Sequence, residues 1–393
     1  PGEYEGTVTV KSGGEVQLTF TVRLLVVNHA LPPVSEWAFH LDLWQFPFQL
    51  SGLCADNGQK VTPFSSEYFT LVKPFYQLLA DAGQKVITAY IKDGAFNKGQ
   101  TMVKWHEAAD GKWSFDYTGF DKFVAQMMSW GIGRQISCFS LVGWNTSIGY
   151  TDASGEARTL KLTVGSDEYR TVWNEFLDSF ERHLKTKGWF EKTVLYMDEI
   201  REDEMRQVVS FIKQHNPDWK IGLAGSAVSS DVESAFYDYS TILGYDRTST
   251  NAVATFYTSC AQSIPNAYVS LDNNPAEMVW VAWYAKAKGL NGFLRWAYDY
   301  WTKADPQDVR DGSNTAGDFS LIYRSDNSLS SVPLSSIRLE LLREGIQDYE
   351  KMRILSTNLM NPVVQKFTLT SGRFAGEIVT EAQGMLKKIS AEY

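Results

Sequence analysis

The chain has 393 residues and a formal net charge of −9, and 44% of its residues are hydrophobic. This hydrophobic content is enough for a sizeable buried core. The acidic balance argues against nucleic acid as a partner, because nucleic-acid binding needs clustered lysine and arginine. No apolar stretch reaches the roughly 18 residues of a membrane span. None of the three cysteines lies in a CxxC pair, and we expect neither a metal nor a cofactor.

Residues 1–33 predict two strands, over 7–10 and 16–27, around a turn at Ser12-Gly13-Gly14. Pro32 and Pro33 end this pattern. Two strands alone are marginally stable in water, so we interpret them as the tail of an N-terminal β-sandwich domain. The chain begins without an initiator methionine or a signal peptide, which indicates a processed or truncated form.

From residue 34 onward, short apolar runs alternate with amphipathic segments. Strands are predicted over 36–44, 85–91, 135–142, 193–199, 219–225, 241–245, 253–259 and 292–298, and helices over 67–82, 117–130, 167–187, 202–215, 275–288 and 336–356. Eight such units predict a (β/α)8 TIM barrel over 34–362. An open doubly wound sheet is the alternative, but no GxGxxG or GxxxxGK[ST] motif follows a strand.

Three segments stand outside this repeat. Hairpin-like insertions over 102–117 and 150–164 follow the second and third predicted strands. Residues 363–393 form a C-terminal helical appendage that ends in an amphipathic helix over 374–390.

The strongest candidates for chemistry are Asp198 and Glu199, at the end of the fourth predicted strand. Barrel enzymes place their active sites at the carboxyl ends of the strands, and where a strand stops both neighbours can reach the pocket. Adjacent carboxylates suit substrate-assisted glycoside cleavage, in which a 2-acetamido oxygen of the sugar attacks the anomeric carbon. One carboxylate would orient the amide and the other would protonate the leaving oxygen. Two like charges this close should also raise the pKa of one of them.

The chain is 14% aromatic, with 13 tryptophans, and indole faces stack on the apolar C–H faces of sugars. From strand-end position, the predicted substrate-binding residues are His40, Trp44, Trp144, Asn145, Tyr196, Tyr245, Tyr257, Trp296, Tyr298, Asp299 and Trp301. A lone strand histidine such as His40 is often a core residue, but its place beside Asp42, Trp44 and Gln45 favours a pocket wall, and Asp299 could equally be a loop cap. No His/Cys cluster has metal-ligand spacing, and no GxSxG elbow is present.

Two other functions remain open from the residues alone. One is a glycosidase for a different sugar that uses a distant nucleophile such as Asp42 or Asp299. The other is a catalytically silent glycan-binding protein.

Several segments, taken in order, resemble glycoside hydrolase family 123, the β-N-acetylgalactosaminidases. They are LYMDEIREDEMR, ATFYTSCAQSIPNAYVS, WYAKAKGLNGFLRWAYDYW, AGDFSLIY and SSIRLELLREGIQDYEKMRIL, and the resemblance runs from about Trp37 to Leu355. Two features depart from it. Ile200 stands where many relatives have arginine, and residues 324–336 replace a short Pro-Gly turn.

The resemblance implies a (β/α)8 barrel preceded by a β-sandwich, and exo-acting, retaining removal of terminal β-linked N-acetylgalactosamine from glycans or glycolipids without a metal. By motif position, it implies that Asp198 stabilises the acetamido group and that Glu199 is the general acid/base. Carbohydrate is then the expected partner, and a periplasmic or secreted location is expected.

Overall fold

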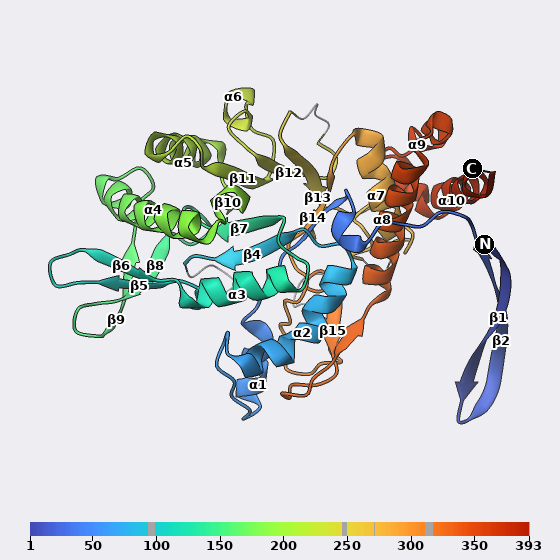
Figure 1. The fold of residues 1–393 in the computed structure, drawn as a ribbon, viewed down its shortest axis with the longest axis horizontal. Coiled ribbons are helices and arrows are strands. Elements are labelled where there is room, and N and C mark those ends of the chain that lie inside the picture. Colours follow the sequence, from blue (N-terminus) through green and yellow to red (C-terminus); the bar gives the residue numbers. More distant parts are fainter. Residues whose placement is uncertain (93–98, 246–249, 271, 311–316, 393) are drawn as a thin grey trace.

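The structure is a computed structural model that describes residues 1–92, 99–245, 250–270, 272–310 and 317–392. Eight parallel strands form its centre (Figure 1). They are β3 (His40–Leu43), β4 (Val86–Tyr90), β7 (Gln135–Phe139), β10 (Thr193–Asp198), β11 (Lys220–Gly225), β12 (Asp238–Ile242), β13 (Val253–Tyr257) and β14 (Gly292–Arg295). Their order around the sheet is β3-β14-β13-β12-β11-β10-β7-β4. This nearly closed ring confirms the predicted (β/α)8 barrel.

The last seam of the barrel, between β3 and β4, is completed largely by side chains. A parallel bridge joins Leu41 to Gln84. The side-chain amide of Gln84 then accepts a hydrogen bond from the Leu43 amide at 2.9 Å and donates one to the Leu43 carbonyl at 3.1 Å. Gln84 therefore takes the place of a strand peptide, which satisfies backbone groups that an open edge would leave unpaired.

Helices surround the strands. They are α2 (Ser66–Asp81), α3 (Thr118–Ser129), α4 (Asp167–Lys187), α5 (Glu202–His215), the one-turn α6 (Ser230–Glu233), α7 (Glu277–Lys288) and α8 (Ile337–Leu355). Helix α4 shows how the sequence sets its ends. The Ser166 hydroxyl caps its first turn by accepting from the Tyr169 amide, and Gly188 ends it with a φ of +70°.

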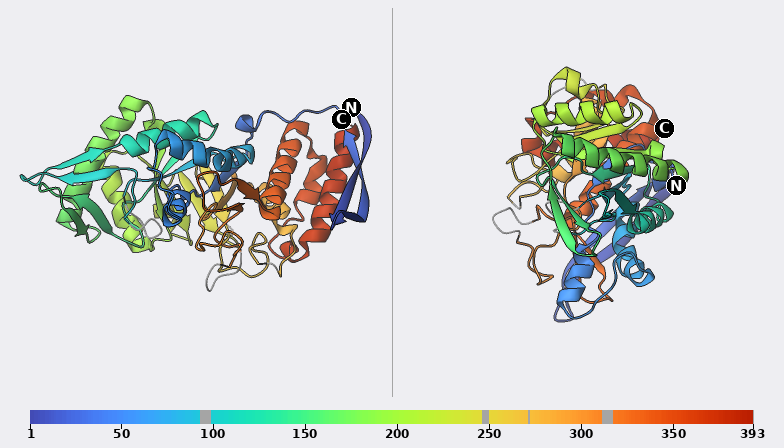
Figure 2. Two further views of the ribbon diagram at one scale, coloured as in Figure 1. Left: turned by 90° about the horizontal axis from the view of Figure 1, so that it is seen from below. Right: turned by 90° about the vertical axis from the view of Figure 1, so that its left-hand side faces the viewer.

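The two predicted hairpin insertions join into one four-stranded sheet of order β6-β5-β8-β9. Its strands are β5 (Lys104–Glu107), β6 (Trp113–Asp116), β8 (Ser147–Thr151) and β9 (Ala157–Lys161). The buried Trp105 anchors this sheet on α4, where its ring stacks on Phe176 at 4.7 Å. The sheet forms one end of the elongated molecule (Figure 2).

A β-hairpin lies at the opposite end, beside the C-terminal helices (Figures 1 and 2). It consists of β1 (Gly2–Ser12) and β2 (Glu15–Val26), and the helices there are α9 (Asn361–Val364) and α10 (Ala375–Glu392). One face of the hairpin is apolar and exposed, because Tyr4 pairs with Leu24 and Val8 with Phe20. That residues 1–33 belong to a β-sandwich remains a prediction.

The structure also differs from the predicted elements. The predicted strand over 241–245 is displaced, since β12 spans Asp238–Ile242. Helix α1 (Gln49–Asp56) was not predicted, nor was the hairpin of β15 (Ile322–Arg324) and β16 (Pro333–Ser335). Short 3-10 turns occur at Val34–Glu36, Phe190–Lys192, Asn358–Met360 and Ser371–Phe374. Within the described residues, no helix has the length and apolar character needed to cross a membrane.

Candidate active site

A cavity of about 210 Å³ opens at the carboxyl ends of the barrel strands. It is lined by Trp44, Trp144, Asp198, Glu199, Ala224, Tyr257, Ser259, Cys260, Leu294, Trp296, Asp318 and Phe319. Six of these, Trp44, Trp144, Asp198, Glu199, Tyr257 and Trp296, are among the residues predicted for the site. A larger cavity of about 580 Å³ lies between the β1–β2 hairpin and helices α8 and α10. That larger cavity is away from the strand ends, where barrels carry their chemistry.

Backbone geometry brings Asp198 and Glu199 to the same cavity. Asp198 is the last residue of β10, and the Glu199 amide still donates to the Ala224 carbonyl of β11 at 2.8 Å. Successive side chains of a continuing strand would point to opposite faces. Glu199 instead has a φ of +50°, a left-handed conformation that costs a non-glycine residue about 1 kcal/mol. This turn lets both carboxylates line one pocket.

The pair carries a strongly perturbed acid. Burial raises the pKa of Asp198 to about 8, and the nearby Glu199 charge adds to the increase. Near neutral pH Asp198 therefore keeps its proton. The sequence analysis expects the raised pKa to keep the general acid protonated, which by the resemblance is Glu199, whereas in the structure the raised pKa belongs to Asp198.

Tyr257, at the end of β13, connects Glu199 to another part of the cavity wall by a hydrogen bond. Its hydroxyl donates to Oε1 of Glu199 at 2.9 Å. Burial, and then the Glu199 charge, raise the pKa of Tyr257 well above its ordinary value. Tyr257 therefore remains a protonated donor throughout the physiological pH range.

Aromatic rings make up much of the remaining wall. Trp144 is 60% exposed, and its indole nitrogen donates to the Asp198 carbonyl at 3.2 Å. Trp44 packs edge-on against Phe139, with ring centroids 4.9 Å apart. Trp296 packs edge-on against Phe319 at the same separation. Such rings offer flat apolar surfaces on which the C–H faces of a sugar can stack.

Two further predicted residues lie below the cavity, inside the barrel. His40 is buried with Nε2 4.0 Å from Oδ2 of Asp238. Burial and, to a lesser extent, Arg134 and Lys85 lower the pKa of His40 to about 3, so its imidazole is neutral. Tyr196 is fully buried, and its hydroxyl donates to Asp238 at 3.5 Å.

The other predicted residues do not line the cavity. Asn145 accepts from the Ser147 amide at 2.9 Å, and Tyr245 lies in the turn after β12, where its amide donates to the Ile242 carbonyl. The remaining three, Tyr298, Asp299 and Trp301, are buried in structural contacts. The Tyr298 hydroxyl donates to the Phe75 carbonyl, and the Trp301 indole donates to the Ile322 carbonyl. Asp299 accepts from the Phe46 amide and the Tyr76 hydroxyl.

Four polar or aromatic residues of the wall were not predicted. Ser259 and Cys260 follow β13 directly, and Asp318 and Phe319 lie in the AGDFSLIY segment. Their position just after strands, or in a segment that carries the family resemblance, was the available signal. In the described part of the chain, no group of three or more His, Cys, Asp or Glu side chains is arranged to hold a metal ion.

Comparison with known proteins gives a family match. Residues 50–355 match the family described as glycoside hydrolase 123, catalytic domain. None of the curated proteins matches the chain.

Among solved structures, the family 123 glycoside hydrolase from Clostridium perfringens, described in terms of glycolipid glycan hydrolysis, has a TM-score of 0.87 at 24% identity, covering 100% of this chain and 76% of that one. The maltogenic α-amylase AmyB from Thermotoga neapolitana has a TM-score of 0.39 at 11% identity, with coverage of 75% and 73%. A fungal β-1,4-galactanase structure has a TM-score of 0.38 at 12% identity, covering 76% of this chain and 98% of that one.

Proposed function

Because the chain belongs to glycoside hydrolase family 123, we propose that it releases terminal β-linked N-acetylgalactosamine from glycans or glycolipids by substrate-assisted catalysis. The observation that carries this proposal is the adjacent pair of Asp198 and Glu199, turned into one cavity by the left-handed backbone of Glu199. Adjacent carboxylates leave no room for a sugar carbon between them. They fit a reaction in which the nucleophile belongs to the substrate.

In the first step, the carbonyl oxygen of the 2-acetamido group attacks the anomeric carbon and the bond to the leaving oxygen breaks. Asp198 accepts the amide N–H hydrogen bond and stabilises the positive charge of the oxazolinium ion. Glu199 gives its proton to the leaving oxygen. In the second step, Glu199 takes a proton from water as the water attacks the anomeric carbon, and the bond between this carbon and the acetamido oxygen breaks. Two inversions at this carbon retain the β configuration.

This scheme needs a proton on Glu199, whereas the raised pKa of Asp198 keeps a proton on that residue. Binding of the substrate changes which carboxyl group is protonated. An N–H group that donates to Asp198 favours the ionised form of this carboxyl group. Binding therefore moves the proton to Glu199, next to the leaving oxygen. The correct substrate thus sets the protonation state that its own cleavage requires.

A distant nucleophile has less support, because neither candidate lines the cavity. Asp42 is 1% exposed inside the barrel, and burial together with the Asp238 charge raises its pKa well above the ordinary value, which disfavours its anionic form. Asp299 is occupied by the Phe46 amide at 2.8 Å and the Tyr76 hydroxyl at 3.3 Å. An anionic nucleophile is required at the anomeric carbon, and neither residue provides one there.

The nature of the nucleophile is tested by weakening the acetamido oxygen. We would measure kcat for aryl β-glycosides that carry N-acetyl, N-fluoroacetyl and N-trifluoroacetyl groups at C2. The proposal predicts a steep fall along this series, because each fluorine withdraws electrons from the attacking carbonyl. A flat series would show that a protein carboxylate attacks instead. Binding of all three sugars without turnover would favour the silent glycan-binding protein.

A further inference from the structure

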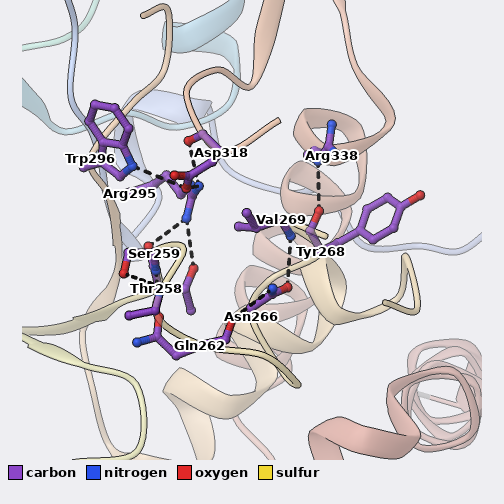
Figure 3. A network of polar contacts seen from close by, with 11 residues as sticks. Thr258, Ser259, Gln262, Asn266, Tyr268, Val269, Arg295, Trp296, Asp318 and Arg338 are labelled. Carbon is purple, nitrogen blue, oxygen red and sulfur yellow. Dashed lines mark hydrogen bonds and ion pairs between the residues drawn. The ribbon is translucent and has the colours of Figure 1, made fainter. Parts of the chain in front are cut away.

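Asp318 is a charged residue of the cavity wall that the proposed chemistry does not use. It is 1% exposed and lies in the segment after β14. Its Oδ1 atom accepts hydrogen bonds from the Arg295 guanidinium and, at 3.5 Å, from the Trp296 indole nitrogen (Figure 3). The carboxylate is therefore fixed at the edge of the cavity, beside the aromatic ring of Trp296.

Arg295 holds this arrangement from below. Its side chain is fully buried, and it donates to the Thr258 carbonyl and to the Asp318 carbonyl, each at 2.7 Å. One guanidinium thus joins the segments that follow β13 and β14 (Figure 3). A buried ion pair seldom stabilises a fold more than apolar residues of the same size would. A role for the carboxylate in the pocket accounts for its presence better than stability does.

The order of the strands places Asp318 across the barrel from the catalytic pair. Asp318 follows β14, and Asp198 ends β10, which is four positions away in the ring of eight strands. In a pyranose ring, C4 lies opposite the anomeric carbon, C1. A sugar whose C1 faces Asp198 and Glu199 therefore directs its C4 edge, with the attached C6 group, toward the wall that contains Asp318.

We propose that Asp318 is a substrate-recognition residue that accepts a hydrogen bond from a hydroxyl on the C4–C6 edge of the bound sugar, with Trp296 stacked beside it. This inference rests on the proposed function, because it takes C1 to lie at the catalytic pair. The other strand-end side chains here, Leu294, Trp296 and Phe319, cannot accept a hydrogen bond from a hydroxyl, so the acceptors on this side are Asp318 and the neutral Ser259 hydroxyl. A charged acceptor held in place by arginine discriminates strongly between sugars with and without the matching hydroxyl.

The test is a binding cycle that needs no turnover. We would titrate the wild-type protein and the Asp318→Asn variant with N-acetylgalactosamine and its 3-deoxy, 4-deoxy and 6-deoxy forms by calorimetry. In the wild type, removal of the 4- or the 6-hydroxyl should weaken binding by roughly tenfold to a hundredfold, the effect of losing a hydrogen bond to a charged group. In the variant, the same deletion should cost at most about one third of that factor, because the partner charge is gone.

Asp348→Asn serves as the matched control. Asp348 is also buried and paired, with Lys351 at 3.0 Å, but it lies outside this cavity. This variant should keep the full wild-type penalty for the 4- or 6-deoxy sugar. If it does not, the coupling would be a general effect of losing a buried carboxylate, and the proposal would be overturned.

Three results contradict the proposal without relying on any variant being folded. In the first, the wild-type protein binds the 4-deoxy and 6-deoxy sugars with the same affinity as the parent sugar. In the second, only the 3-deoxy sugar binds more weakly. In the third, N-acetylgalactosamine does not bind. The cycle is independent of hydrolysis. Coupled binding in a protein that cleaves no N-acetylgalactosaminide would overturn the proposed function and leave the role of Asp318 standing.

Discussion

The hydroxyl of Tyr257 and Oε1 of Glu199 lie 2.9 Å apart, and this contact joins the end of β13 to the residue that follows β10. Among the residues that the structure describes, Tyr257 is the only hydrogen-bond partner of the Glu199 carboxyl group. Glu199 is otherwise exposed and has a left-handed backbone. Tyr257 therefore limits the positions that the catalytic carboxyl group can occupy.

We predict that Tyr257→Phe lowers kcat/KM by roughly tenfold to a hundredfold, the effect of removing one hydrogen bond to a charged group. The ring remains, so the cavity keeps its shape. Tyr169→Phe is the matched control, because the Tyr169 hydroxyl donates to the Leu141 carbonyl in the scaffold at 3.1 Å. The measurement is kcat/KM of both variants on an aryl N-acetylgalactosaminide, from steady-state kinetics. Equal losses in the two variants would show that Tyr257 acts only through stability.

The two carboxylates should respond differently to the leaving group. Glu199→Gln removes the proton donor, so turnover should fall by about 10²–10⁴-fold for an alkyl leaving group and much less for nitrophenol, which needs no proton to leave. Asp198→Asn should slow the step that forms the oxazolinium ion for both leaving groups. The measurement is kcat/KM for methyl and 4-nitrophenyl glycosides. If Asp198→Asn showed the stronger dependence on the leaving group, Asp198 would be the proton donor and the proposed roles would be reversed.

Activity should fall at alkaline pH. The reaction needs one proton on the pair, and the free enzyme loses it as the pH rises through the Asp198 pKa of about 8. Because kcat/KM reports ionisations of the free enzyme, its basic limb should lie near pH 8. A limb near pH 5 would mean that Asp198 has lost its proton at neutral pH, which contradicts its raised pKa.

The same pKa shift predicts how stability depends on pH. Asp198 titrates at about 8 when folded, against an ordinary value of 3.8. Between these values the folded protein retains a proton that the unfolded chain has lost, so the contribution of Asp198 to stability falls as the pH rises from about 4 to 8. Asp198→Asn removes this dependence. The variant should melt at a higher temperature than wild type at pH 8, with the difference shrinking toward pH 4.

Thermal unfolding at pH 4, 6 and 8 measures this difference. Asp56→Asn is the control, because Asp56 is exposed. A wild-type melting temperature above that of Asp198→Asn at pH 8 would contradict the raised pKa.

The sequence predicts most of the barrel because its strands are apolar runs between amphipathic helices. The strand predicted over 241–245 lies too far along the chain, and the reason is physical. The actual strand β12 contains Asp238 and Ser240, which are polar but buried. Polar residues inside a strand conceal the apolar pattern on which strand prediction depends. Helix α1 follows β3 closely and lacks a side-chain cap, so it gave no start signal.

The candidate site divides in a similar way. Asp198 and Glu199 could be found because they end a strand, and strand ends converge in a barrel. Asp318 had only the family resemblance of its segment as a signal, because its place on the wall depends on the buried Arg295 that reaches it from β14. Tyr298 and Asp299 also follow β14, but their side chains turn toward α2 and β3 neighbours, including Phe75 and Phe46. Position along a strand does not determine which way the chain turns after it.

The most direct test of substrate-assisted catalysis compares 4-nitrophenyl β-N-acetylgalactosaminide with its gluco epimer and with the plain β-galactoside. We expect release of nitrophenol from the galacto acetamide and none from the plain galactoside, because only the acetamido sugar carries its own nucleophile. Comparable release from the plain galactoside would contradict substrate-assisted catalysis by Asp198 and Glu199, and release from none of the three would contradict the proposed activity.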